Sequence, residues 1–316
     1  MARIAIVRGG RSLERDFSLQ SGHHVAAALR HTDHIIEEVD VDSDLVRTLS
    51  NCDVAFIALH GRDGEDGTLQ ATCEALGVAY TGSPPLTCRL AFDKGLTKGM
   101  LRRAGLPTPP AYVVSSDAVR HMGAGAALRR AADRLGYPVV LKPAAQGSAL
   151  GLSVVQDATD LTAAAMAAFD HGDRVLIERF VPGDELSIAV AGPELDALPA
   201  VEIRTTTGVH DFETRLSPGA SEYVCPARLP DDALRAAAVV AVDVARTIGI
   251  RDFGRVDIRI GPDGPQVLDI KTCPGLTEGS ILPLAATQSG RTFEQLALQI
   301  VDAALARMGH ATVPTQ

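Results

Sequence analysis

The chain has 316 residues, which at about 150 residues per domain allows two or three domains. Apolar residues make up 46% of it and charged residues 22%, a composition typical of a folded globular protein and not of a disordered one. Acidic residues outnumber basic ones by 39 to 30, and the net charge of −9 disfavours general DNA or RNA binding. The apolar run at the start is too short for a signal peptide, and no run of 18 apolar residues predicts a membrane span.

Cysteine and lysine usage is informative. The five cysteines are widely spread, with no CxxC pair or zinc-like spacing, so we expect free thiols in a cytoplasmic protein. Only four of the 30 basic residues are lysines, and arginine does not replace lysine where a compact ammonium is needed. The lysines are therefore candidate functional residues: Lys94, Lys98, Lys142 and Lys271.

The first 86 residues alternate apolar strands with helical segments, which predicts a parallel sheet covered by helices. The expected strands are 3–8, 53–59 and 78–81, and the expected helices are 18–29 and 68–76.

Two further units are expected, at 87–182 and 183–316. The second should hold helices 90–104 and 124–135 and strands 138–142, 152–155 and 173–178, the first two strands antiparallel. The third should hold strands 186–191, 199–204, 254–260 and 265–270 with helices 231–247 and 293–307.

Three local patterns suggest a nucleotide site, and each also has a simpler explanation. The glycine-containing loop 144–151 follows Lys142-Pro143 and could bring backbone N–H groups to phosphate oxygens, or be an ordinary hairpin loop. Period-two spacing on strands 254–260 and 265–270 places Asp257 and Asp269 where they could hold Mg²⁺, or join a surface ion-pair cluster. The segment 178–185 could bind a purine edge and ribose hydroxyls, or be an acidic turn.

These patterns occur together with other motifs over nearly the whole chain, and the chain resembles an ATP-grasp enzyme, most closely the D-alanine–D-alanine ligase family. The stretches that carry the resemblance are Gly9-Gly-Arg-Ser-Leu-Glu-Arg15, Ser18-Leu19 with Ser21-Gly22, Leu59-His-Gly-Arg-Asp-Gly-Glu-Asp-Gly-Thr-Leu-Gln70, Tyr80-Thr-Gly-Ser83, Asp93-Lys94 with Thr97-Lys98, Ala104-Gly-Leu-Pro-Thr-Pro109, Lys142-Pro143 with Gly147-Ser148, and Gly254-Arg-Val-Asp257. The resemblance implies an α/β fold of three subdomains: a Rossmann-like N-terminal one, and two that hold ATP between their sheets. It also implies a homodimer with small amino-acid substrates.

The resemblance assigns roles to particular residues. ATP would be held by Lys94 and Lys142 at the phosphates, by Glu178, Phe180 and Val181 at the adenine, and by Glu185 at the ribose. Asp257 and Asp269 would bind Mg²⁺, and Arg255 would hold the phosphate and the developing oxyanion. Glu14, His60 and Ser148 would surround the first amino acid, and Gly275, Ser280 and Ile281 the carboxylate of the second. A lid at about 208–226 would exclude water from an acyl phosphate.

The sequence departs from the family pattern at three places. The metal strand reads Asp269-Ile270-Lys271 where the family has Glu-x-Asn, and an ammonium cannot ligate a cation. Lys271 is therefore a candidate catalytic cation whose charge would stand in for one of the two magnesium ions that the resemblance implies, or a group that pairs with Asp257 or Asp269 and hinders metal binding. The lid reads Thr214-Arg215-Leu216 in place of a Lys-Tyr pair, with Arg215 keeping the charge at the substrate, and Gln146 replaces a usual Glu.

Three functions stay open on the sequence. The first is D-alanine–D-alanine ligation for peptidoglycan, in an ATP-dependent, ADP-forming reaction. The second is a diverged ligase that makes another dipeptide or amide, and the third is an ATP-binding homologue without ligase activity. A dehydrogenase is disfavoured, since Gly9-Gly10 is not part of a GxGxxG motif.

Overall fold

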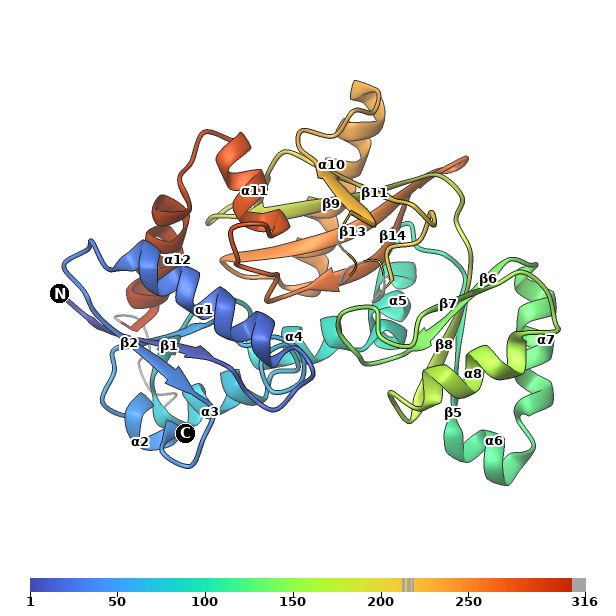
Figure 1. Ribbon diagram of the computed structural model, residues 1–316, viewed down its shortest axis with the longest axis horizontal. Helices are drawn as coiled ribbons and strands as arrows, with labels where there is room; N and C mark the ends of the chain where they lie inside the picture. Colours follow the sequence, from blue (N-terminus) through green and yellow to red (C-terminus); the bar gives the residue numbers. More distant parts are fainter. Residues whose placement is uncertain (212–213, 215–216, 218, 309–316) are drawn as a thin grey trace.

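The computed structural model describes residues 1–211, 214, 217 and 219–308, and places them in three sheets with helices around them (Figure 1). In this part of the chain no helix is long and apolar enough to cross a membrane. The five cysteines are free thiols, as predicted.

The N-terminal sheet is wholly parallel, which confirms the prediction from strand–helix alternation. Its strands, in spatial order, are β2 (Ile35–Asp40), β1 (Arg3–Arg8), β3 (Val54–Ile57) and β4 (Ala79–Tyr80). Its helices are α1 (Arg15–Leu29), α2 (Leu45–Leu49) and α3 (Thr68–Leu76). The sequence analysis missed β2, whose Glu37 and Glu38 interrupt the apolar run because this strand lies at the sheet edge.

The central sheet is antiparallel and small. Its strands, in spatial order, are β5 (Ala111–Ser115), β8 (Arg174–Arg179), β6 (Val139–Pro143) and β7 (Ser153–Val155). Helices α6 (Ser116–Met122), α7 (Gly125–Leu135) and α8 (Leu161–Phe169) accompany it, and leucines and alanines of α7 and α8 pack in one core with β6 and β8. The predicted antiparallel pairing of the strands around loop 144–151 is confirmed by β6 and β7.

The C-terminal sheet supplies the longest strands. Its main path is β12 (Ser221–Val224), β11 (Val201–Thr205), β9 (Asp184–Ala191), β13 (Phe253–Gly261) and β14 (Gly264–Lys271), and β10 (Asp196–Ala197) pairs with β9. Helix α10 (Asp231–Ile248) covers it through an alanine- and valine-rich face.

The prediction of one helix over 90–104 is wrong, because two helices meet there. Helix α4 (Pro85–Phe92) ends at Asp93, which is extended, and α5 (Lys94–Arg103) begins at the next residue. The Asp93 carboxylate accepts hydrogen bonds from the N–H groups of Gly95 and Leu96, which makes it the N-cap of α5. This break places Lys94 in the first turn of α5, where its own N–H donates to Ala144 O (2.8 Å).

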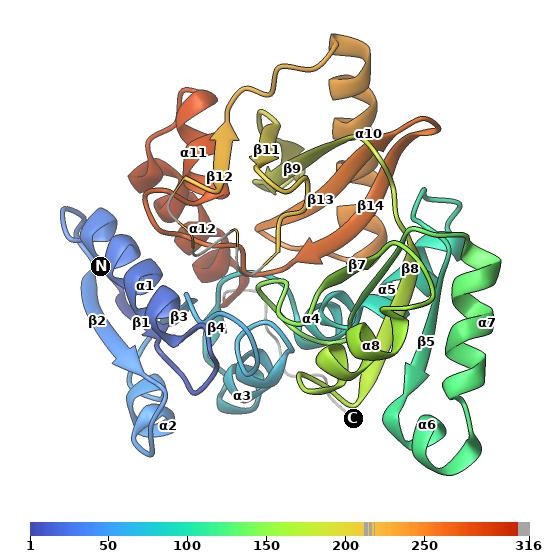
Figure 2. The same cartoon turned by 45° about the vertical axis from the view of Figure 1, so that its right-hand side comes forward.

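The last two helices pack against the N-terminal sheet as well as against the C-terminal sheet. Helices α11 (Ile281–Gln288) and α12 (Phe293–Met308) share a hydrophobic core with β1, β3 and α1, and the views show α12 beside α1 (Figures 1 and 2). The ends of the chain are thus joined in one core, so the segment that precedes α11 is held close to the N-terminal loops. The subdomain boundaries at 86/87 and 182/183 stay predictions.

Candidate active site

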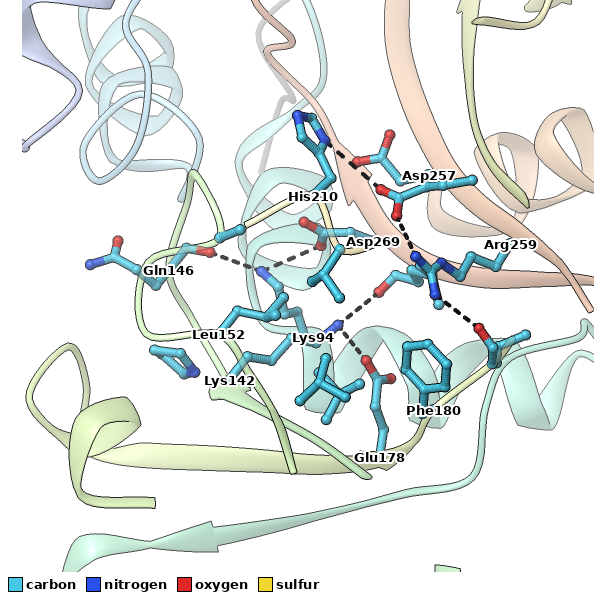
Figure 3. Close-up of a pocket in the computed structure, with 18 of the residues that line it drawn as sticks. Lys94, Lys142, Gln146, Leu152, Glu178, Phe180, His210, Asp257, Arg259 and Asp269 are labelled. Atoms are coloured by element: carbon cyan, nitrogen blue, oxygen red, sulfur yellow. Dashed lines mark hydrogen bonds and ion pairs between the residues drawn. The ribbon is translucent and has the colours of Figure 1, made fainter. Parts of the chain in front are cut away.

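The larger set of predicted site residues lines one cavity between the central and C-terminal sheets (Figure 3). Lys94 comes from α5, Lys142 from β6, and Glu178 from β8, while the opposite wall comes from β9, β13 and β14. The predicted residues that line it are Lys94, Lys142, Glu178, Phe180, Val181, Glu185, Asp257, Asp269 and Lys271.

Glu178 is the centre of a buried ion cluster. Its carboxylate lies 2.5 Å from Lys142 Nζ and 2.7 Å from Lys98 Nζ, and the Lys98 ammonium also donates to Thr108 Oγ1 (2.7 Å). Burial lowers the pKa of Lys98 to about 8, whereas for Lys142 the nearby Glu178 carboxylate outweighs burial and raises the pKa. Two lysines on one carboxylate leave excess positive charge at the cavity wall, which suits a polyanionic ligand.

Lys94 holds the glycine-containing loop. Its Nζ donates to Gln146 O (2.9 Å) and lies 3.4 Å from Asp269 Oδ1 (Figure 3). Burial lowers the pKa of Lys94, and Asp269 opposes that effect. The ammonium therefore lies between the loop and β14, at the end of the cavity where loop N–H groups could meet phosphate oxygens.

Asp257 and Asp269 are cross-strand partners in the register of β13 and β14, as the period-two pattern predicted. Arg255 donates to both Asp257 oxygens (2.9 and 2.7 Å), and Ser187 donates to Oδ1 (2.5 Å). The two Asp269 oxygens face Lys94 at 3.4 Å and Lys271 at 3.6 Å. Burial opposes ionisation of both carboxyls, but these cations hold both pKa values below the usual range.

These two carboxylates fit one Mg²⁺ ion shared with nucleotide phosphates, because Mg²⁺ is commonly held by one or two carboxylates plus phosphate oxygens. They are not a complete protein cage. Among the described residues no group of three or more His, Cys, Asp or Glu side chains is placed to hold a metal ion.

Sequence reasoning missed Arg259 and His210 at the other end of this cavity. The Arg259 guanidinium lies 5.0 Å from the Phe180 ring centroid, donates to Val181 O (3.0 Å) and lies 3.3 Å from Glu185. His210 lies 3.9 Å from Glu185 and 3.3 Å from the Tyr223 hydroxyl. Arg259 was detectable, because period two places it on the same strand face as Arg255 and Asp257. His210 lies in the segment 208–226 that was predicted as a lid, but no pattern singled it out.

A second cavity adjoins the first. Its lining includes Glu14, His60, Ser148, Arg255, Gly275, Ser280 and Ile281, all predicted to contact amino-acid substrates or the reacting group. Among the described lining residues Lys271 is the one common to both cavities. The Ser148 hydroxyl from the β6–β7 loop donates to the Glu14 carboxylate at the start of α1, so this loop closes against the N-terminal subdomain.

His60 connects the N-terminal subdomain to the segment before α11. Its Nδ1 faces Cys273 O (3.2 Å), which can only accept, so Nδ1 carries the proton and Nε2 accepts from the Ser21 hydroxyl (2.8 Å). Ser21 Oγ in turn accepts from the Leu276 N–H (3.3 Å). Burial lowers the pKa of His60 to about 4, so the imidazole is neutral at pH 7.

Glu65 is a buried acid that the sequence analysis left without a role, although it lies inside a motif that carries the resemblance. Its Oε2 lies 3.4 Å from Lys271 Nζ, and its Oε1 accepts from the Gly61 N–H (3.2 Å). Burial raises the pKa of the Glu65 carboxyl. Its burial appears only in the fold, because Gly64-Glu65-Asp66-Gly67 reads in the sequence as an exposed polar turn.

Close packing surrounds Gly275. A Cβ at this position would lie 2.6 Å from the Phe17 ring and 2.7 Å from Ser280 Oγ, so a larger residue would displace these side chains. Ser280 directly precedes α11, and its hydroxyl pairs with that of Thr277 (2.7 Å). Ser280 and Ile281, at the start of this helix, line the second cavity.

Two predicted lid residues, Arg215 and Leu216, lie outside the described residues. All other predicted site residues line one of the two adjoining cavities.

Comparison with known proteins agrees with the resemblance found in the sequence. The family model described as D-ala D-ala ligase C-terminus matches residues 100–302, and the model described as D-ala D-ala ligase N-terminus matches residues 41–83. The chain is 40% identical over 308 residues to the D-alanine–D-alanine ligase of Alcanivorax borkumensis, covering 97% of this chain and 95% of that one. It is 39% identical over 309 residues to that of Moorella thermoacetica, with 96% and 99% covered.

Solved structures of ligases of this kind also resemble the fold of this chain over nearly its whole length. The D-alanine–D-alanine ligase of Bacillus anthracis complexed with ATP has a TM-score of 0.84 at 26% identity, with 99% of this chain and 100% of that chain covered. The VanG D-Ala:D-Ser ligase of Enterococcus faecalis has a TM-score of 0.83 at 25% identity, with 96% and 99% covered.

Proposed function

The chain belongs to the D-alanine–D-alanine ligase family, and from this premise we propose that it joins two D-alanine molecules for peptidoglycan synthesis. It is an ATP-dependent, ADP-forming dipeptide ligase with the ATP-grasp fold. The observation that carries ligation is the pair of adjoining cavities, one rich in buried cations and one with a carboxylate, a neutral imidazole and a helix start, and the choice of D-alanine rests on the relatives.

The reaction has two steps. A carboxylate oxygen of the first amino acid attacks the γ-phosphorus of ATP, a new P–O bond forms, and the bond to the β,γ-bridging oxygen breaks with its electron pair leaving on ADP. The neutral amine of the second amino acid then attacks the acyl carbon and forms a C–N bond. The C–O bond to phosphate breaks, its electron pair leaves on inorganic phosphate, and the amine proton passes to that phosphate or to water.

Protein cations would neutralise the charge that moves during these steps. Phosphoryl transfer depends mainly on positioning and charge stabilisation. Lys94 and Lys142 would contact the phosphates of ATP, and Arg255 would contact the transferred group and the oxyanion of the second step. The buried Glu178 cluster supports this role for Lys142, because the carboxylate holds its ammonium at the cavity wall.

Adenine and ribose would lie at the far end of the nucleotide cavity. Phe180 and Val181 would pack against the base, with Glu178 near its polar edge, and Glu185 would accept from ribose hydroxyls. The placement of Arg259 over the Phe180 ring supports a planar ligand there, because a guanidinium stacks on aromatic faces.

Mg²⁺ would be held by Asp257 and Asp269 and would supply charge neutralisation at the phosphates. The residues of this chain position the reactants. Glu14, fixed by Ser148, would hold the amine of the first amino acid beside His60. Gly275, Ser280 and Ile281 would hold the carboxylate of the second, and Arg215 would carry a positive charge in the lid.

A second candidate is the same chemistry with a different second amino acid. It is favoured by the sequence of the lid, where Arg215 and Leu216 replace the Lys-Tyr pair of the family. The third hypothesis, an ATP-binding protein without ligase activity, is not supported by the family relationship, and it is one outcome of the following experiment.

The test is ADP release by the purified protein with ATP and Mg²⁺, first with D-alanine and then with a panel of D- and L-amino acids, with mass spectrometry of the products. D-alanyl-D-alanine as the main product is expected. A different main product would replace the proposal by the second candidate. ATP binding without ADP release for any pair would overturn ligation altogether.

We also propose that the protein acts in the cytoplasm as a homodimer. The five free thiols support a reducing compartment. Light scattering on the eluting protein would test the homodimer, and a monomer mass would contradict it.

A further inference from the structure

Lys271 occupies the wall between the two cavities. It is the last residue of β14, the residue as a whole is 8% exposed, and its cross-strand partner is Arg255. One face of this lysine borders the cavity of Lys94 and Asp269, and another borders the cavity of Glu14 and His60. A phosphoryl group that passes from ATP to an amino acid must cross this wall.

Two carboxylates fix the ammonium at this point. Lys271 Nζ lies 3.4 Å from Glu65 Oε2 and 3.6 Å from Asp269 Oδ2. A buried cation is costly without such partners, and two of them, one on each side, define where the charge sits. Opposite charges at this distance favour the charged form of a lysine, so the two carboxylates keep the ammonium in place as a cation.

The same geometry limits how many metal ions fit. An ammonium has three donors and no acceptor, so Lys271 cannot ligate a cation. It also lies on Oδ2 of Asp269, one of the oxygens that a second ion would need. Asp257 and Asp269 are the carboxylates of the predicted metal site, and Lys271 places a fixed positive charge beside Asp269.

Resting on the proposed ligase function, we propose that Lys271 is a catalytic residue that contacts the phosphoryl group during its transfer, and that it replaces a second divalent ion. In the first step its N–H groups donate to oxygens of the γ-phosphoryl group as the P–O bond to ADP breaks and the bond to the substrate carboxylate forms. Its charge offsets the negative charge that the two reactants bring together. The protein then uses one Mg²⁺ per ATP.

The primary test counts ions without turnover. The full-length protein is saturated with the non-hydrolysable analogue AMPPNP, and bound Mn²⁺ is counted by equilibrium dialysis and electron paramagnetic resonance. One Mn²⁺ per nucleotide is expected for the wild type. Lys271→Asn, which offers a carbonyl oxygen, is expected to bind two, and Lys271→Met, which offers no ligand, to bind one. Two ions in the wild type, or one in Lys271→Asn, would overturn the inference.

A kinetic test separates catalysis from folding. Lys271→Met is expected to lower kcat by about 100-fold or more, as for loss of one charge-stabilising donor, with the affinity for AMPPNP changed less than threefold. If Lys271→Met leaves Glu65 as an unpaired buried charge and unfolds the protein, the double variant Lys271→Met with Glu65→Gln removes that charge as well. The double variant should show the same loss of kcat. Arg134→Met, an exposed change on α7, is the charge-matched control and should be unchanged. A kcat within threefold of wild type in both Lys271 variants would overturn a catalytic role.

These outcomes differ from a failure of the proposed function. Absence of D-alanyl-D-alanine would refute the substrate assignment, whereas the Mn²⁺ count needs neither substrate nor product. If another amino-acid pair is joined, the kinetic test is run with that pair.

Discussion

The imidazole of His60 and the hydroxyl of Ser21 lie 2.8 Å apart, and through them the N-terminal subdomain holds the backbone that precedes α11. His60 follows β3 and Ser21 lies in α1. Their partners, Cys273 O for His60 and the Leu276 N–H for Ser21, lie more than 200 residues away in the chain. The segment proposed to bind the second amino acid is therefore positioned from the other end of the molecule.

Ser21→Ala should raise the KM for the second amino acid more than it lowers kcat. The substitution leaves the Leu276 N–H and His60 Nε2 without their hydroxyl partner, so the segment before α11 loses its fixed position. Steady-state kinetics with each amino acid varied in turn would measure the effect. Ser50→Ala, an exposed change in the N-terminal subdomain, is the control, and an equal rise in KM for ATP would speak against the explanation.

Protonation of His60 should weaken the fold between about pH 6.5 and pH 4. Burial lowers its native pKa to about 4, so in this range the unfolded state binds more protons than the native state. The free energy of unfolding must then fall as the pH falls, by on the order of 2 kcal/mol from this group. Urea denaturation of wild type and His60→Asn at pH 7, 6, 5 and 4.5 measures it.

The informative quantity there is the difference between the two proteins. Subtraction removes the contribution of acids that lie far from His60. Glu65, 3.9 Å from the ring, has a raised pKa that acts in the opposite direction, so the triple comparison of wild type, His60→Asn and His60→Asn with Glu65→Gln isolates His60. Parallel curves for wild type and His60→Asn would show that His60 is not held neutral by burial.

Glu178→Gln should be strongly destabilising, by about 3–5 kcal/mol, because it leaves two buried ammonium groups without their carboxylate. The double variant Glu178→Gln with Lys98→Met should recover part of this loss, since one excess charge is removed with it. Chemical denaturation is the measurement, and Glu194→Gln, an exposed acid, is the control. A loss under 1 kcal/mol would mean that the lysines find other partners or water.

Gly147→Ala should reduce activity without unfolding the protein. A Cβ at this loop position would lie 2.4 Å from the Glu14 carboxylate, so the loop could no longer close against α1. Displacement of this kind costs between about tenfold and 100-fold in rate, with a small change in Tm.

The matched control for this prediction is Gly99→Ala in the middle of α5, where a Cβ meets no neighbouring atom within 4 Å. It should leave activity intact and stabilise the protein by about 0.5–1 kcal/mol through helix propensity. Equal activity in the two variants would contradict the proposed contact between the loop and Glu14.

Local pattern predicted most of the helices and strands, whereas the roles of the nucleotide-site residues came from the resemblance to a family. Period two placed Arg255 with Asp257, and Asp269 with Lys271, on one face of their strands, and the register of β13 and β14 then pairs Asp257 with Asp269. Strand and helix alternation predicted the parallel N-terminal sheet for the same local reason. The scarcity of lysine singled out residues that the fold then gathers around Glu178 and Asp269.

Contacts between distant segments could be decided only in three dimensions. The pairing of Glu65 with Lys271 joins residues 206 positions apart, and His210 reaches Glu185 from an irregular loop. The break between α4 and α5 could not be predicted from the sequence pattern either. The apolar spacing continues through Asp93, although the Asp93 side chain caps the start of α5. Periodicity reports which face of an element is buried, but not which other element covers it. The sequence therefore contains the parts of the site, and the packing of three sheets and of α12 against α1 sets which charges meet.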